Sequence, residues 1–188
     1  MIDRLCDETG GKDIAVVGLY CDFLSQQEQS TTSMLGAILK QLVSRGETPE
    51  HIREAFQKAK KEFGGRGLRL PDIVEIIKKT VKALPRVFIC IDALDESTPK
   101  YRRELLESLR EIAQVSANAR LFLTGRPHVG DEIRKCFCNV VRIPVSPTRD
   151  DIKSYLEMRL DNDTDLDVMD DELRGDIMRV IPEKTGEM

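Results

Sequence analysis

Long hydrophobic runs are absent from this chain of 188 residues. No apolar segment approaches the roughly 20 residues that a membrane-spanning helix needs. The first residues, MIDRLCDETGGKD, lack a basic start followed by an apolar block, so no signal peptide is visible. With 40% hydrophobic and 33% charged residues, the composition is that of a folded chain rather than a disordered or membrane protein. We therefore expect a cytoplasmic protein without a membrane partner.

An excess of one charge is also missing. The net charge is −4 and both signs are interspersed, which gives no electrostatic reason to expect nucleic acid as a partner. The five cysteines are an odd number without CxxC spacing, which favours reduced thiols over a disulfide framework. Cys136 and Cys138 supply only two ligands and cannot close a zinc site. His51 and His128 lie far apart in the sequence, and neither is assigned a role.

Apolar strand-like segments alternate with amphipathic helical segments along the chain. The expected strands cover residues 13–23, 87–91, 119–125 and 139–145, and the expected helices cover residues 30–43, 48–63, 71–84, 98–115, 148–160 and 172–181. Thr148 and Asp151 resemble a capping box. In the helix over 98–115, the charged residues Arg102, Arg103, Glu107 and Arg110 are expected to face solvent. The pattern predicts an α/β three-layer sandwich with a mostly parallel sheet, because nearly continuous apolar strands suit a sheet covered on both faces.

Three carboxylates follow the apolar run of VFICIDALDES, at Asp92, Asp95 and Glu96. In open α/β sheets, ligands bind beyond the carboxyl ends of the strands, where Asp92 falls. Asp95 and Glu96 could simply favour the start of the next helix through its dipole. Three adjacent acids repel one another, however, unless a cation or hydrogen-bond donors offset them. A strand ending in Asp, followed by two residues and Asp-Glu, has the form of a Walker B element that holds Mg²⁺ and polarises a water molecule.

A second strand-end motif is LFLTGRPHV, residues 121–129, which carries Thr124 and Arg126 beyond its apolar part. If this strand neighbours the previous one, Arg126 lies near the carboxylates. Its planar guanidinium could hold a phosphate. The alternative is a structural pair between Arg126 and an aspartate.

These two motifs, together with VVGLYCDFLSQQEQST and RIPVSPTRDDIKSYLEMRL, resemble the NACHT domain. NACHT domains belong to the STAND class of P-loop NTPases, and the likeness is greatest to fungal signalling proteins with ankyrin or similar repeats. The resemblance implies ATP or GTP and Mg²⁺ as cofactors. It also implies that Asp92 holds the metal, that Asp95 and Glu96 act on the hydrolytic water, and that Thr124 and Arg126 contact the nucleotide. Residues 1–145 would form a partial NTPase core, and residues 146–188 would begin a helical subdomain.

The phosphate-binding loop GxxxxGK[ST] is absent from these residues. The nearest stretch, TGGKD at residues 9–13, lacks the first glycine and has Asp13 where Ser or Thr is required. In the family, the loop and its strand precede the residues that correspond to the first six of this chain. We therefore expect little NTP hydrolysis by this chain alone. We also expect either a gap in the sheet or an unusual pairing of the strand over 139–145.

Two other functions stay open. The first is a non-catalytic module for protein interaction or self-association, which the missing phosphate loop favours. The second is calcium binding by DNDTDLDVMDDE, residues 161–172, which has acids at loop positions one, three, five and twelve of an EF-hand. Position six is Leu166, where the sharp turn needs glycine. A solvated acidic linker between two helices is therefore the simpler interpretation of this segment.

Overall fold

The computed structural model describes residues 14–44, 67–162 and 170–184, together with residues 50, 52–54 and 57. It divides into two compact units, Met1–Val140 and Val141–Met188, and each is described by itself. Most of the expected helix over 48–63 lies outside the described residues, and the residues of it that are described, 50, 52–54 and 57, are helical.

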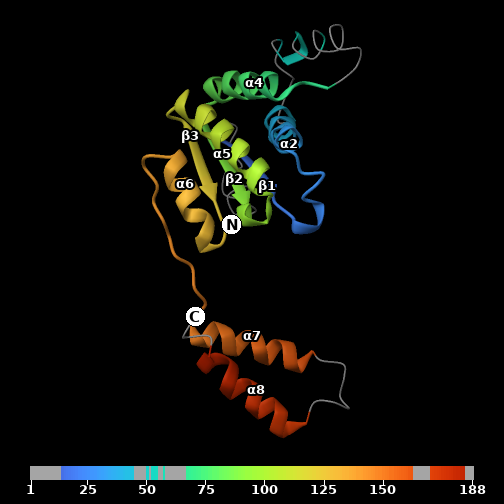
Figure 1. Ribbon diagram of the computed structural model, residues 1–188, viewed down its shortest axis with the longest axis vertical. Helices are drawn as coiled ribbons and strands as arrows, with labels where there is room; N and C mark the ends of the chain where they lie inside the picture. The colour runs from blue at the N-terminus through green and yellow to red at the C-terminus, as the bar shows by residue number, and fades with distance from the viewer. Residues whose placement is uncertain are drawn as a thin grey trace. The chain divides into compact units, whose positions relative to one another are not determined.

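The first unit is built on a parallel sheet of three strands, β1 (Ile14–Tyr20), β2 (Arg86–Asp92) and β3 (Ala119–Leu123), in the order β1-β2-β3 (Figure 1). The register places Tyr20 opposite Asp92 and Ile91 opposite Leu123, so the carboxyl ends of the strands reach the same edge. The helices α2 (Thr31–Val43) and α4 (Leu70–Ala83) lie between β1 and β2, α5 (Pro99–Gln114) lies between β2 and β3, and α6 (Gly130–Cys136) follows β3. The predicted α/β fold with a parallel sheet is confirmed.

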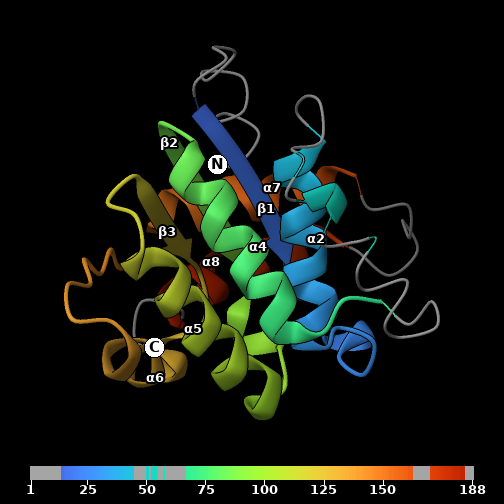
Figure 2. The same cartoon turned by 90° about the horizontal axis from the view of Figure 1, so that it is seen from above.

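Local sequence signals explain where the main helices begin. The Ser30 side chain accepts a hydrogen bond from the Ser33 N–H at the start of α2, and Thr98 does the same for the Tyr101 N–H at the start of α5. Pro71 and Pro99 stand in the first turns of α4 and α5, where a missing N–H costs nothing. The helices α2, α4 and α5 lie on the same face of the sheet (Figure 2).

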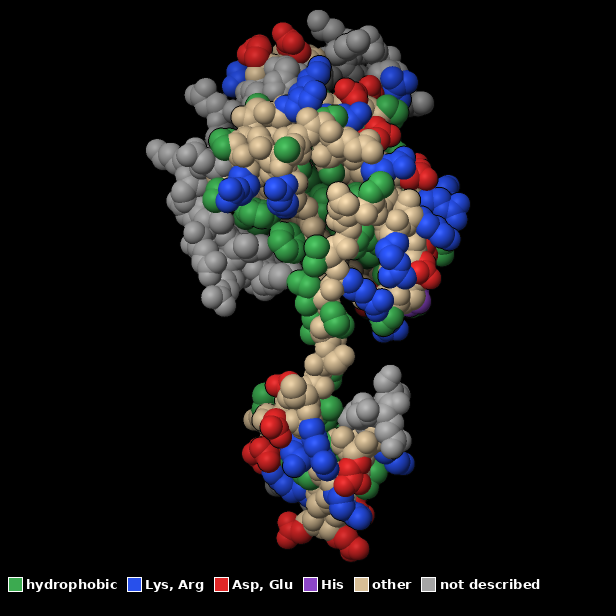
Figure 3. Space-filling model, turned by 90° about the vertical axis from the view of Figure 1, so that its left-hand side faces the viewer, with side chains coloured by type: hydrophobic (Ala, Val, Ile, Leu, Met, Phe, Trp, Pro, Cys, Tyr) green, Lys and Arg blue, Asp and Glu red, His purple; other side chains and the backbone are tan. Residues whose placement is uncertain are grey.

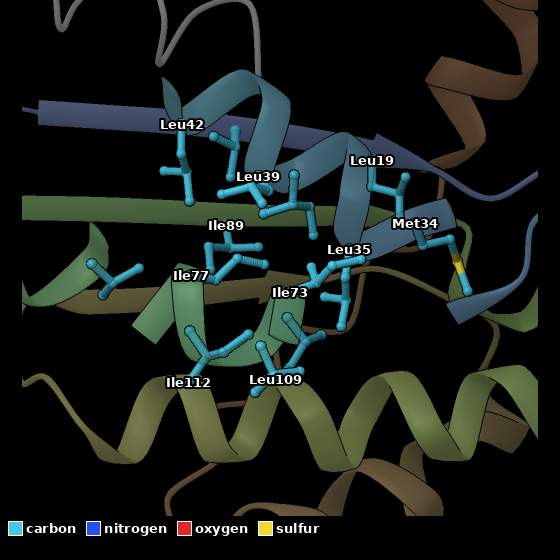
Figure 4. Close-up of a cluster of buried hydrophobic side chains, with 14 of the residues drawn as sticks. Leu19, Met34, Leu35, Leu39, Leu42, Ile73, Ile77, Ile89, Leu109 and Ile112 are labelled. Carbon is cyan, nitrogen blue, oxygen red and sulfur yellow. The ribbon is translucent and has the colours of Figure 1, made fainter. Parts of the chain in front are cut away.

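The core lies between this sheet face and the three helices (Figure 4). Every second strand residue points into it, among them Val17 on β1 and Ile89 on β2. The helices contribute residues at three- and four-residue spacing, such as Leu35, Ile77 and Leu109, all fully buried. Burying each such side chain contributes about 1.5–3 kcal/mol, so this face holds the first unit together.

The predicted strand over 139–145 is wrong. These residues form no regular structure, and Val141, Ile143 and Val145 are 87%, 77% and 90% exposed. Hydrophobic side chains, drawn in green, lie along the narrow chain segment that leads into the second unit (Figure 3). A β-branched sequence becomes a strand only when a neighbouring strand takes its backbone hydrogen bonds. Within the described part of the chain, no strand lies beside this segment.

One helical expectation needs correction, and one helix was not predicted. Arg102 was expected to face solvent, but it is only 6% exposed, because its spacing from Leu105 and Leu109 puts it on the inner face of α5. The short helix α6 follows β3 without an amphipathic repeat long enough to predict it. It lies against α5, and its Ile133 packs on the edge of the core.

The second unit is a pair of helices, α7 (Arg149–Asp161) and α8 (Asp171–Lys184). The capping box at the start of α7 is confirmed. The Thr148 side chain accepts from the Asp151 N–H at 3.1 Å, and the Thr148 N–H donates to the Asp151 carboxylate at 2.8 Å. The Thr148 hydroxyl also donates to the Asp151 carboxylate at 2.7 Å, and this bond, together with the one from the Thr148 N–H, lowers the pKa of Asp151. Among the helices that the structure describes in either unit, none has both the length and the apolar character to cross a membrane.

Candidate functional site

The two predicted motifs meet at the carboxyl edge of the sheet. Because β2 and β3 are parallel neighbours, Asp92 and Thr124 follow paired residues, and the Thr124 hydroxyl donates a hydrogen bond to Asp92 Oδ1. The Thr124 N–H donates to the Ile91 carbonyl at 2.9 Å, which continues the ladder one step past β3. The expectation that the two strands are neighbours is therefore confirmed.

Thr124 also shapes the turn that carries the carboxylates. Ala93 has a left-handed backbone with φ of 53°, a conformation that costs a non-glycine residue roughly 1–3 kcal/mol. Its N–H donates to Thr124 Oγ1 at 3.0 Å, and the Leu94 N–H donates to the Thr124 carbonyl at 2.9 Å. These bonds hold the short 3₁₀ turn η2 (Leu94–Glu96), from which Asp95 and Glu96 project.

Asp95 contacts Arg126. The Arg126 N–H donates to Asp95 Oδ1 at 3.1 Å, and Arg126 Nε lies 3.4 Å from Asp95 Oδ2. The Asp95 side chain is 8% exposed and that of Arg126 is 76% exposed. Both carboxylate oxygens of Asp95 are therefore engaged by Arg126. This arrangement is the structural Arg–Asp pair that the sequence left open as an alternative to roles in catalysis and phosphate binding.

Gly125 permits the close approach of the two loops. A Cβ atom at this position would lie 2.9 Å from Val129 Cγ2 and 3.3 Å from Asp95 Oδ1. Val129 is buried and ends the 3₁₀ turn η3 (Pro127–Val129), so it has little room to yield. The glycine of the TGR sequence is thus required by packing against Val129 in its own loop and against Asp95 in the loop after β2.

Glu96 is oriented by a third loop, which the sequence did not assign to the site. The Phe23 N–H donates to Glu96 Oε2 at 3.1 Å, and Gln26 Nε2 donates to the Glu96 carbonyl at 2.7 Å. Asp22 caps the 3₁₀ turn η1 (Phe23–Ser25) by accepting from the Leu24 N–H. The signal was available, because a loop that follows β1 must emerge at the same edge as the loops that follow β2 and β3.

The pKa of Cys21 depends on burial and on the negative charges at this edge. It is buried at the end of β1, and its N–H donates to the Asp92 carbonyl at 3.0 Å. Burial is the main reason that the pKa of its thiol rises to about 11, and the negative charges of Glu96, Asp92 and Asp95 add to the effect. The site therefore keeps Cys21 as a neutral thiol.

The carboxylates at this edge could bind Mg²⁺ only together with the phosphates of a substrate. Among the described residues, no three histidine, cysteine or acidic side chains are arranged to hold a metal ion by themselves. Mg²⁺ in nucleotide sites is bound by one or two carboxylates together with substrate phosphates. Asp92, which is half-buried and accepts from Thr124, fits that single-carboxylate role.

The other residues considered from the sequence, His128, the cysteine pair and the acidic segment over 161–172, are not part of this site. His128 lies in η3 and is exposed, and Cys136 and Cys138 carry free thiols. The possible calcium loop over 161–172 falls largely outside the described residues, since 163–169 are not among them. Of its acids, Asp161 forms an ion pair with Arg174.

The family model for the N-terminal region of nephrocystin 3 matches residues 1–126, which is more than half of the chain. The chain belongs to the nephrocystin 3 N-terminal family. The matched range contains β1, β2 and β3 and all five predicted site residues. The matching model is not that of the NACHT family, so this comparison does not support the NACHT resemblance. No curated protein matches the chain.

Proposed function

We propose that the first unit is the magnesium- and γ-phosphate-facing part of a nucleotide-dependent signalling NTPase of the NACHT kind. The observation that supports this most is the shared carboxyl edge, where Asp92 and Glu96 after β2 lie with Thr124 and Arg126 after β3. Asp92 would bind Mg²⁺ that arrives with ATP or GTP. Glu96 would orient a water molecule, and Thr124 and Arg126 would contact the terminal phosphate.

The hydrogen bonds suggest different tasks for the two acids of η2. The Phe23 N–H bonds only one carboxylate oxygen of Glu96, Oε2, whereas Arg126 engages both oxygens of Asp95. Glu96 is therefore the better candidate to accept a proton from water. Asp95 holds Arg126, and a phosphate would have to compete for that guanidinium. Asp95 then acts by fixing the resting position of Arg126 until an anion replaces it.

Nucleotide binding by this chain alone is expected to be weak. The 188 residues contain no GxxxxGK[ST], whose backbone N–H groups supply much of the phosphate affinity. Calorimetric titration with Mg·ATP and with Mg·GTP tests the proposal. Weak binding that requires Mg²⁺ and is lost in Asp92→Asn is the expected result, without appreciable hydrolysis. Tight magnesium-dependent binding would show that the phosphate loop is dispensable.

A protein-interaction or self-association module is the second candidate. It is favoured by the Asp95–Arg126 pair, which engages both oxygens of the Asp95 carboxylate without a ligand. The alanine variants of Asp92 and Glu96 separate the two functions. If the chain binds a protein partner or itself equally well after both changes, and binds no nucleotide before them, the module is the correct function.

A further inference from the structure

A buried arginine in the first turn of α5 contacts both loops of the candidate site. Arg102 Nη1 donates to the Ser97 carbonyl at 2.8 Å. Its Nε and Nη2 donate to the two carboxylate oxygens of Glu132 at 2.9 and 2.8 Å. Ser97 directly follows Glu96, whereas Glu132 lies in the first turn of α6, just after the loop that carries Arg126. One guanidinium therefore connects the segment after β2 to the segment after β3.

The chemistry of this contact makes it rigid. A guanidinium forms two parallel hydrogen bonds with a carboxylate in a fixed plane, and its remaining N–H groups can serve a third acceptor. The hydrogen bond to Glu132 is the main reason that the pKa of Arg102 is raised, and the same bond lowers the pKa of Glu132. Both groups stay charged at neutral pH, and a buried charge is destabilising once its partner is lost.

At Ser97, the segment after β2 makes few other hydrogen bonds. The Ser97 hydroxyl is buried, and it has no hydrogen-bond partner. The second ion pair between the loops, Asp95–Arg126, has an arginine that is largely exposed, and exposed pairs contribute little in water. Arg102, with its 6% exposure, is the better shielded of the two connections.

We propose that Arg102 is a positioning residue that fixes the separation between Glu96 and Arg126. That separation sets the space for a terminal phosphate and its water molecule. The mechanical part of the proposal stands on the contacts alone, and the nature of the ligand rests on the proposed nucleotide function. Glu132 is the second residue of this arrangement, because its carboxylate accepts from Nε and Nη2 of Arg102.

Amide hydrogen exchange on the 188-residue chain without nucleotide tests the mechanical part. The informative amides are those of Ala93, Leu94 and Arg126, which bond across the two loops. In Arg102→Met they should exchange about tenfold faster, the size expected for losing roughly one charged hydrogen bond from a local opening. Arg102→Lys, which keeps the charge and one donor, should give a smaller acceleration. Arg110→Met, an exposed position on the same helix, is the matched control and should change nothing.

The pattern of exchange decides between positioning and general stability. Amides of the β1–β2 ladder should be unaffected once any change in global unfolding is subtracted. Acceleration by the same factor everywhere, or none at the three loop amides, overturns the proposal. If Arg102→Met fails to fold, Glu132→Gln takes its place as the test variant. The Glu132 side chain is partly exposed, and its loss should loosen the Arg126 amide while sparing the ladder.

A nucleotide titration separates the two parts of the proposal. If the unmodified chain binds Mg·ATP, binding should weaken about tenfold in Arg102→Met and remain unchanged in Arg110→Met, and equal binding by both variants overturns the positioning role. If the unmodified chain does not bind Mg·ATP, the proposed function fails, and the exchange pattern alone decides whether Arg102 positions the loops.

Discussion

The two outer strands of the sheet, β1 and β3, differ in how their outward backbone groups are hydrogen-bonded. Toward the carboxyl end of β1, several outward backbone groups are bonded by side-chain amides. Gln41 of α2 accepts from the Gly18 N–H at 2.9 Å and donates to the Gly18 carbonyl at 2.7 Å. Gln29 repeats the arrangement one step later, accepting from the Asp22 N–H and donating to the Tyr20 carbonyl, both at 3.0 Å. Each glutamine reproduces the pair of hydrogen bonds that a further strand would make.

The edge of β3 has no such cover. Asn118 and Thr124 bond to β2, so the alternating pattern of a parallel ladder turns the backbone groups of Leu121 and Leu123 outward. Within the described part of the chain, these outward groups have no hydrogen-bond partner. An open strand edge is a template for another strand. Among the described residues, side chains therefore close part of the β1 edge, whereas the β3 edge is open to another strand.

Gln41→Ala should have the largest effect on this comparison. The change leaves the partly buried N–H and carbonyl of Gly18 without partners, and each such loss costs about 1–3 kcal/mol. We expect the free energy of unfolding to fall by about 2–3 kcal/mol in a urea titration. Lys40→Ala, at the exposed neighbouring position of α2, is the control. Equal losses in the two variants would mean that the edge of β1 does not depend on the glutamine.

Thr124→Val tests the inner side of β3, where the strand is anchored rather than open. Valine matches the shape of threonine but removes the hydroxyl that bonds Asp92 Oδ1 and the Ala93 N–H. We expect a loss of about 2 kcal/mol in the free energy of unfolding, because a carboxylate and a strained turn lose their partner. Thr124→Ser keeps the hydroxyl and should cost much less. A serine variant as unstable as the valine variant would show that the methyl group, not the hydroxyl, carries the effect.

The sequence predicted the parts of the fold that depend on local patterns. Strand β2 and helix α5 follow from the apolar run before Asp92 and from the Thr98-Pro99 start of a three-four repeat. The carboxyl-edge position of Asp92 and Thr124 followed from parallel topology alone. The helix after Thr148 followed from its capping box.

What the sequence could not predict depends on distant neighbours. The segment over 139–145 has the composition of a strand, but a strand also needs a partner, which composition does not reveal. Arg102 was placed outward because it is charged, although its spacing matched the buried face. Its hydrogen bonds to Glu132 and Ser97 help to offset the cost of its burial. The loop after β1 reaches Glu96 across 73 residues of sequence, a contact that no local motif encodes.

Charge at the open edge should change self-association more than charge at the closed one. Phe122 is exposed on β3, and Tyr20 is exposed at the end of β1. A lysine on an edge strand opposes strand pairing, so Phe122→Lys should raise the dissociation constant of any self-associated form about tenfold, measured by analytical ultracentrifugation. Tyr20→Lys should leave it unchanged, because that edge is already bonded by Gln29. Equal effects of the two lysines, or a chain that stays monomeric at high concentration, would break the comparison.

The smallest predicted effect lies at Cys21, where the closed edge meets the carboxylates. Folding raises the pKa of this thiol from an ordinary value of 9.0 to about 11, chiefly by burial. The unfolded chain therefore loses this proton before the folded one does. The contribution to stability is complete below about pH 9 and disappears between pH 9 and about pH 11. Between pH 8 and pH 10, the native chain should lose about 1 kcal/mol more than Cys21→Ala. Cys138→Ala, at an exposed thiol, should follow the native chain, and parallel curves for all three would mean that folding does not raise the pKa of Cys21.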